Sequence, residues 1–263
     1  MKKILIAGML LVGSTLFAQD INTESPSFSA GGMTVSKNIF QVETNFGVNL
    51  KLLNNTNNHD FILPTMLIRY GITKRLEVRV NPIMKLNKTN YQLVGTNVGA
   101  KYNIIGQKEQ KVQMSIIGGY ALPVVSLATK INFNTVLTFN YDFAEKHSLG
   151  VNLGYQYLDF RISNAKIKTN LFLATLIYNY QITNRLSCFV EGKVDLWRTK
   201  LVNIVPQING GPSARYFWDT GLLYKFGDRY QIDYVFGMNF DNSYKFHMLG
   251  FHFMLNTSKK QKK

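Results

Sequence analysis

The stretch Asn132–Phe143 reads Asn-Phe-Asn-Thr-Val-Leu-Thr-Phe-Asn-Tyr-Asp-Phe, and its alternation of apolar and polar residues decides the fold. Neighbouring side chains of a β-strand point to opposite faces. Phe133, Leu137 and Phe139 therefore share one face of an extended segment, while Asn134 lies on the other. Such a pattern is typical of a strand that lies between an apolar and a wet surface.

The same period of two runs from Asn38 to Asn256, so the sequence predicts many strands in succession. We count about twelve, each long enough for a tilted crossing of a bilayer, which takes roughly 9–11 residues. The predicted fold is therefore all-β: a transmembrane, antiparallel, up-and-down β-barrel of about twelve strands in the outer membrane of a Gram-negative bacterium. A soluble barrel or sandwich with one apolar core face is the alternative.

The chain divides into four expected parts. Met1–Ala18 has a charged start followed by an apolar stretch, and it is predicted to be a signal peptide. Gln19–Lys37 is predicted to be a periplasmic N-terminal segment, Asn38–Asn256 the barrel and Thr257–Lys263 a basic C-terminal tail. The only cysteine, Cys188, allows no internal disulfide.

The expected connections between strands alternate in length. Thr73-Lys74 and Thr183-Asn184 are short, whereas Arg198–Ser213 is long. Outer-membrane barrels place short turns on the periplasmic side and longer loops outside, so we expect both ends of the mature chain in the periplasm. Aromatic residues lie beside the short turns, as in the girdle at a lipid–water boundary: Tyr70, Tyr102, Tyr141, Phe143, Tyr178, Tyr180, Tyr224, Phe226 and Tyr230.

The chain carries a net charge of +15, although only 17% of its residues are charged. Basic residues scattered over the strands of a secreted protein do not fit nucleic-acid binding, and we expect no nucleic-acid partner. The expected partners are outer-membrane lipid and lipopolysaccharide, the barrel-assembly machinery during insertion, and a small-molecule solute that the sequence does not name.

Charged residues that alternate with apolar ones are expected to face the barrel lumen. Glu77 and Arg79, for example, alternate with Leu76, Val78 and Val80. The lumen-lining candidates are Arg69, Glu77, Arg79, Lys101, Glu191, Lys193, Asp195, Asp219 and Asp233. Because buried charges must pair, we expect ion pairs and hydrogen bonds across the interior, with Glu77 between the two arginines.

The sequence offers no catalytic motif. No serine lies in a Gly-x-Ser-x-Gly motif, and His-Glu-x-x-His does not occur. His247 and His252 are five positions apart on one predicted strand, so they point to opposite faces and cannot share a metal ion. We predict no catalytic residue, no metal site and no cofactor, and we expect that the protein is not an enzyme.

Several stretches carry a resemblance to a known family. They are Glu24-Ser25-Pro26, Phe40-Gln41-Val42-Glu43-Thr44, the predicted hairpin Ile68–Arg79, Asp219–Leu222 and Asp228–Asp233. Together they resemble the outer-membrane transporter family labelled "MetA-pathway of phenol degradation". The resemblance implies a barrel that passes small compounds, aromatic or hydrophobic ones among them.

Three functions remain open at this point. The first is a channel or transporter for passive or facilitated passage of a small solute. The second is a structural wall protein of the outer membrane whose lumen is filled by its own side chains. The third is a lipid hydrolase of the outer membrane. An open bore, a filled bore and a nucleophile beside a base would distinguish them, respectively.

Overall fold

A computed structural model of the chain describes residues 21–24, 28–53, 56–87, 90–106, 110–123, 128–162, 165–202, 212–240 and 244–257. The predicted signal peptide and the lysines of the C-terminal tail lie outside the described residues. None of the described residues belongs to a helix long and apolar enough to cross a membrane.

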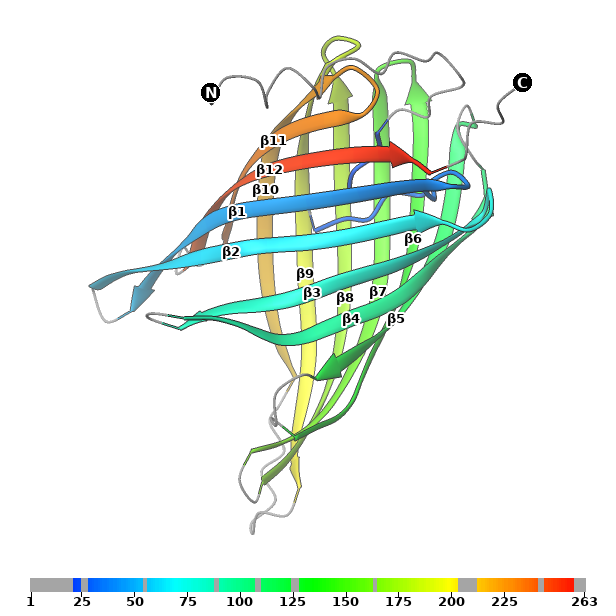
Figure 1. Ribbon diagram of the computed structural model, residues 1–263. Coiled ribbons are helices and arrows are strands. Elements are labelled where there is room, and N and C mark those ends of the chain that lie inside the picture. Colours follow the sequence, from blue (N-terminus) through cyan, green and yellow to red (C-terminus); the bar gives the residue numbers. More distant parts are fainter. Residues whose placement is uncertain are drawn as a thin grey trace, which may run out of the picture.

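Twelve antiparallel strands close into one barrel, and this confirms the predicted fold class (Figure 1). Each strand pairs with its neighbours in the sequence, and β1 pairs with β12 to complete the circle. The strands are β1 (Ile39–Leu53), β2 (Thr56–Gly71), β3 (Leu76–Asn87), β4 (Asn90–Ile105), β5 (Val112–Pro123), β6 (Ala128–Ala144), β7 (His147–Ile162), β8 (Ala165–Gln181), β9 (Leu186–Val202), β10 (Ser213–Phe226), β11 (Tyr230–Asn239) and β12 (Tyr244–Asn256).

The alternation of the sequence becomes an outward apolar face and an inward polar face. Outward positions include Phe139, Leu153 and Leu176, all of them exposed. Inward positions of the same strands include the buried Thr138 and Asn152. A closed barrel satisfies every ladder hydrogen bond of its strands, so this apolar surface can lie in lipid without an open edge.

The short turns gather at one end of the barrel. β8 and β9 are joined there by a tight turn in which the Ile182 amide donates to the Leu186 carbonyl at 2.9 Å. The residues that precede β1 and follow β12 also meet here, because the Thr257 amide donates to the Asn38 carbonyl at 2.8 Å. This end is the periplasmic one in the arrangement that outer-membrane barrels follow.

One expected boundary was wrong. We expected the long connection to begin at Arg198, but β9 continues to Val202 and stays paired with β8 through Lys166. The polar residues Arg198, Thr199 and Lys200 therefore stay in β9, because they pair with residues of β8 just as the apolar part of β9 does.

A cation on the outward face tests the placement in lipid. Leu176 in β8 is 57% exposed and faces outward. We expect Leu176→Arg to lower the free energy of unfolding by about 2–4 kcal/mol, because a charge at the centre of the bilayer is desolvated. Urea unfolding in lipid vesicles measures this loss, with the folded fraction read from the gel position of unboiled samples relative to boiled ones. Leu176→Phe is the control, and equal stability of both variants would show that this face does not contact hydrocarbon.

Candidate functional site

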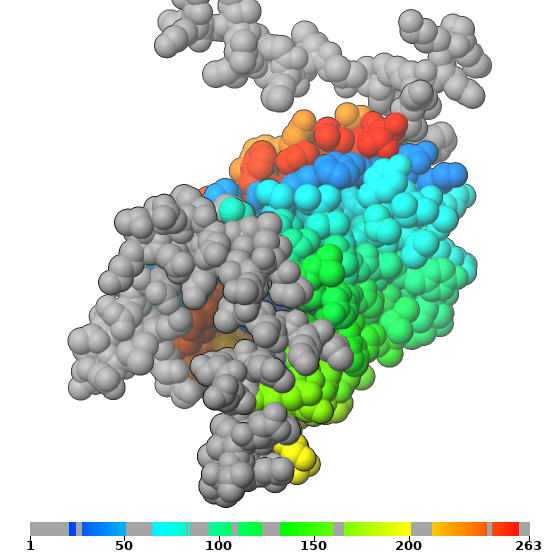
Figure 2. All heavy atoms as spheres, turned by 60° about the horizontal axis from the view of Figure 1, so that its bottom comes forward, coloured from blue at the N-terminus to red at the C-terminus, as the bar shows by residue number. Residues whose placement is uncertain are grey.

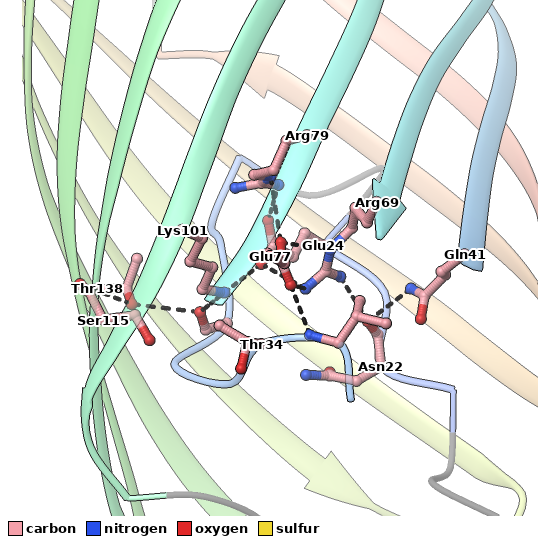
Figure 3. Close-up of polar contacts among 12 residues, drawn as sticks. Asn22, Glu24, Thr34, Gln41, Arg69, Glu77, Arg79, Lys101, Ser115 and Thr138 are labelled. Atoms are coloured by element: carbon pink, nitrogen blue, oxygen red, sulfur yellow. Dashed lines mark hydrogen bonds and ion pairs between the residues drawn. The ribbon is translucent and has the colours of Figure 1, made fainter. Parts of the chain in front are cut away.

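The N-terminal segment runs inside the barrel, near the end with the short turns (Figure 3). The sequence predicted a periplasmic N-terminal segment at this place in the chain, and its described residues contact the inward faces of strands on several sides. The chain leaves the lumen at Asn38, whose φ of 62° turns it into β1. Gly71 makes this path possible, because a Cβ there would lie 2.0 Å from the Ser36 carbonyl oxygen.

Arg69 of β2 is the centre of the charged network that holds the segment. Its side chain is 1% exposed and contacts three carboxylates. Two guanidinium nitrogens, Nε and Nη2, donate to Glu77 at 2.9 Å each, which is a bidentate pair. Nη1 donates to Glu43 of β1 at 3.0 Å, and Nη2 lies 3.3 Å from Glu24 of the segment.

Glu24 brings the segment into this network (Figure 3). Its carboxylate accepts hydrogen bonds from Arg79 of β3 and from Lys101 of β4. Its backbone amide donates to Glu43 at 2.8 Å. Glu24 therefore ties the segment to four consecutive strands, three of them through its own carboxylate.

The network is balanced in charge. It contains three acidic and three basic side chains, all of them in or near the interior: Glu24, Glu43, Glu77, Arg69, Arg79 and Lys101. Isolated buried charges are strongly destabilising, whereas a closed set of ion pairs with good geometry offsets the cost of desolvation. The segment is thus required for the balance, because without Glu24 the basic side chains are in excess.

The electrostatic surroundings of Glu24 act in opposite directions on its pKa. Burial alone would raise the pKa of this carboxyl, but the positive charges of Arg69, Arg79 and Lys101 outweigh burial and hold the pKa well below its usual range. Glu24 is therefore charged at neutral pH and stays so in mild acid.

The backbone of the segment is also hydrogen-bonded to the wall. The Val35 amide donates to Glu77 at 2.6 Å. The Asn22 carbonyl accepts from Gln41 and from Arg69, both at 2.9 Å. Further along, the Gly32 carbonyl accepts from Asn103 of β4 at 2.9 Å and from Ser115 of β5. Polar side chains of the wall thus satisfy backbone groups of the segment that a neighbouring strand would otherwise satisfy.

The segment reaches the opposite wall at Phe28 and Ser29. The Phe28 amide donates to Glu191 of β9 at 2.9 Å, and the Ser29 hydroxyl donates to the same carboxylate. The Phe28 ring packs against Phe217 of β10 and Phe246 of β12, with centroids 5.9 and 5.6 Å away. The segment therefore crosses the lumen and does not merely line one side.

The remaining lumen candidates lie along β9–β12. Lys193 pairs with Asp195 on the same face of β9 at 3.1 Å. Asp219 is fully buried opposite Glu191, and neither of its oxygens has a hydrogen-bond partner within the described ranges. Asp233 pairs with His252 at 2.6 Å.

The structure thus brings four of the predicted residues together in one network: Arg69, Glu77, Arg79 and Lys101. The other candidates lie outside this network, on β9, β10 and β11. Sequence reasoning missed Glu43, although Gln41 and Glu43 alternate with Phe40 and Val42 and the pattern could have assigned them to the lumen. Glu24 carried no such signal, because it lies on no strand.

An open cavity of about 740 Å³ lies beside the segment. Its lining includes Gly31 of the segment, inward side chains such as Asn140 and Asn179, and turn residues such as Lys146 and Asn184. The cavity therefore reaches the end with the short turns. No three His, Cys, Asp or Glu side chains of the described chain gather closely enough to hold a metal ion.

Comparison with known proteins agrees with this architecture. The sequence pattern of the family described as "MetA-pathway of phenol degradation" matches residues 23–255. The chain belongs to this family. The match confirms the resemblance seen in the sequence and covers both the segment from Thr23 onwards and the barrel. A search of curated proteins found no match to the chain.

Two solved structures share the fold. The COG4313 outer membrane channel from Pseudomonas putida F1 superimposes with a TM-score of 0.65 at 9% identity, over 88% of this chain and all of that one. The NanC porin superimposes with a TM-score of 0.55 at 8% identity, over 81% of this chain and all of that one. The twelve-stranded closure and the apolar outward face place this family member in the outer membrane.

Removal of Glu77 tests how dry the network is. We expect Glu77→Ala to lower the free energy of unfolding by about 3–5 kcal/mol, because Arg69 and Arg79 would lose a buried counter-charge. Urea unfolding of the refolded protein measures this loss. Glu145→Ala, at an exposed turn residue, is the control and is expected to change stability by about 0–0.5 kcal/mol. A Glu77→Ala loss below about 1 kcal/mol would mean that water screens the site.

The low pKa of Glu24 predicts a pH dependence with a definite sign. A carboxyl whose pKa is lower in the folded protein than in the unfolded chain stabilises the fold at pH values above the unfolded pKa. This stabilisation is lost as the pH falls through the folded-state pKa. We therefore expect wild type to be more stable than Glu24→Gln at neutral pH, and the gap to narrow on acidification below about pH 4. Parallel unfolding curves across this range measure the gap, and a gap that widens in acid would contradict the assignment.

Proposed function

We propose that the protein is a passive channel for small solutes, and that its N-terminal segment narrows the lumen near the periplasmic end. The observation that carries the proposal is the open cavity beside a segment that crosses a polar-lined, closed barrel. Passage of a solute needs a polar interior that is not completely filled, and this interior meets both conditions.

The cavity gives the solute a size. Its volume of about 740 Å³ lies within the range of pockets that hold small organic molecules. The lining mixes amide side chains such as Gln113, Asn140 and Asn179 with apolar ones such as Ile177 and Phe189. Such a surface exchanges weak hydrogen bonds with a passing solute and retains none of them strongly.

The segment determines where the solute passes. It is attached to β1–β5 through Glu24 and Gly32 and to β9–β12 through Ile21 and Phe28. It also contacts β6 and β8, since the Thr138 hydroxyl donates to the Gly31 carbonyl at 3.3 Å and the Ser29 and Thr175 hydroxyls lie 2.7 Å apart. The cavity lies between the segment and the short turns, so a solute that uses it has to pass the segment. Loosening the segment would widen the way past it.

The family description and the resemblance support small solutes that include aromatic or hydrophobic compounds. We propose passage and not catalysis, and the two solved structures compared above are named as a channel and a porin. Outer-membrane lipid and lipopolysaccharide would contact the outward face, and the barrel-assembly machinery would insert the protein.

A second candidate function has one observation in its favour. The charged network fills the side of the lumen next to β1–β4 with side chains and backbone. A structural wall protein would have an interior filled in this manner throughout, whereas here a cavity remains between the segment and the short turns.

Single-channel recording separates these two functions. We expect stepwise conductance from the refolded protein in planar lipid bilayers. Glu24→Gln should conduct more, or switch more often to a larger level, because the segment loses its charge pairs with Arg69, Arg79 and Lys101.

Asp228→Asn is the matched control, since Asp228 is an exposed acidic residue of a turn at the same end. It should conduct like wild type. A silent wild type together with a silent Glu24→Gln variant would reject the channel and favour the structural function.

A further inference from the structure

A strip of aromatic and basic side chains on β9 and β10 lies on the side of the segment away from the short turns. Its strand residues are Trp197 and Lys193 of β9 and Arg215 and Phe217 of β10, all on the inward face, and Phe28 of the segment forms its inner end. We call these five residues the aromatic strip. None of them lines the cavity or takes part in the Glu24 network.

The outer end of the strip lies toward the end with the long connections, because Arg215 comes two residues after β10 begins at Ser213. Figure 2 looks onto this end and shows a hollow with orange and brown atoms on its visible wall, the colours of the last strands. Arg215 is exposed, Trp197 is half-buried and Phe217 is buried, so the strip descends from the mouth toward the segment.

The two cations of the strip differ in their partners. Lys193 has a carboxylate partner, Asp195 at 3.1 Å, and its Nζ lies 4.5 Å from the centroid of the Phe28 ring. Arg215 contacts rings instead: its guanidinium carbon lies 5.1 Å from the Trp197 centroid and 5.9 Å from that of Phe217. Asp195 lies directly opposite Arg215 on β9, but its carboxylate pairs with Lys193, and among the described residues no ion pair joins a carboxylate to Arg215.

This combination suits one kind of ligand. A guanidinium binds a carboxylate through two parallel hydrogen bonds, and it keeps these donors while it lies over an aromatic face. Rings such as Trp197 and Phe217 favour a second aromatic ring in an offset or edge-on arrangement. An aromatic ring that carries a carboxylate matches both parts of the strip.

The inner end of the strip sets the orientation. Beyond Phe217 lie the buried carboxyl groups of Glu191 and Asp219, and Glu191 already accepts from the segment. Neither carboxyl offers a counter-charge to an anionic group, whereas Arg215 does and the Asp195 that faces it is paired with Lys193. The ligand's carboxylate therefore stays at Arg215, and its ring points toward Phe217 and Phe28.

We propose that the aromatic strip binds small aromatic carboxylates on the outer side of the segment, with Arg215 as the carboxylate-binding residue. The proposal rests on the proposed channel function, for which it names a class of solute. A benzoate-sized acid would bind before it passes the segment.

Trp197 makes the site directly measurable. The chain has two tryptophans, and Trp218→Phe leaves Trp197 as the sole one. We expect benzoate to change the emission of refolded Trp218→Phe protein in a saturable manner. Cyclohexanecarboxylate, which lacks the aromatic ring, should require a several-fold higher concentration, and benzylamine should have no effect, because its cationic group replaces the carboxylate.

Arg215→Gln in the same background should raise the half-saturating benzoate concentration by about tenfold or more. Arg198→Gln is the matched control, because Arg198 is the next residue after Trp197 on β9 but lies on the outward face. Both variants should keep the heat-dependent shift on gels, which shows that the barrel is folded.

An unchanged half-saturating concentration in Arg215→Gln would overturn the proposal, and so would equal responses to benzoate and cyclohexanecarboxylate. Because the emission of Trp197 reports binding without transport, the two proposals can fail separately. Saturable benzoate binding by a protein that shows no conductance would reject the channel and leave the site.

Discussion

The requirement that buried charges be paired governs the interior of this barrel. Arg69 is surrounded by three carboxylates, and one of them, Glu24, belongs to the N-terminal segment in the lumen and not to a strand of the wall. A guanidinium in such a place is stable only while its counter-charges remain, so the fold of the segment and the charge of the wall depend on each other. The N-terminal segment is for this reason part of the interior and not an appendage.

The two sides of the lumen differ in the way they hold the segment. On the β1–β5 side the contacts are charged or polar and directional, as between Glu24 and Lys101 or between Gly32 and Ser115. On the far side Phe28 enters an apolar group that includes Phe246. The hydrogen bonds from Phe28 and Ser29 to Glu191 add directional contacts on this side as well, so the segment is held at both walls.

Most of the fold could be predicted from the sequence, because a period of two in hydrophobicity carries through every strand. The inward position of Glu77 beside Arg69 followed from the same pattern. The position of Glu24 could not be predicted in this way, since residues before Asn38 show no alternation. The burial of His252 against Asp233 was missed as well, because register between β11 and β12 is set by pairing and not by either strand alone.

The path of the segment has a consequence for assembly. Its partners on β1–β5 are nearer in sequence, with Glu24 and Lys101 77 residues apart, whereas Phe28 and Glu191 are 163 residues apart. Contacts between distant residues form late, because the entropy of closing a long loop opposes them. The segment can thus fold against the first strands while the sheet is still open along the future β1–β12 seam. When that seam closes, the segment is already enclosed, and no thread has to enter a finished cylinder.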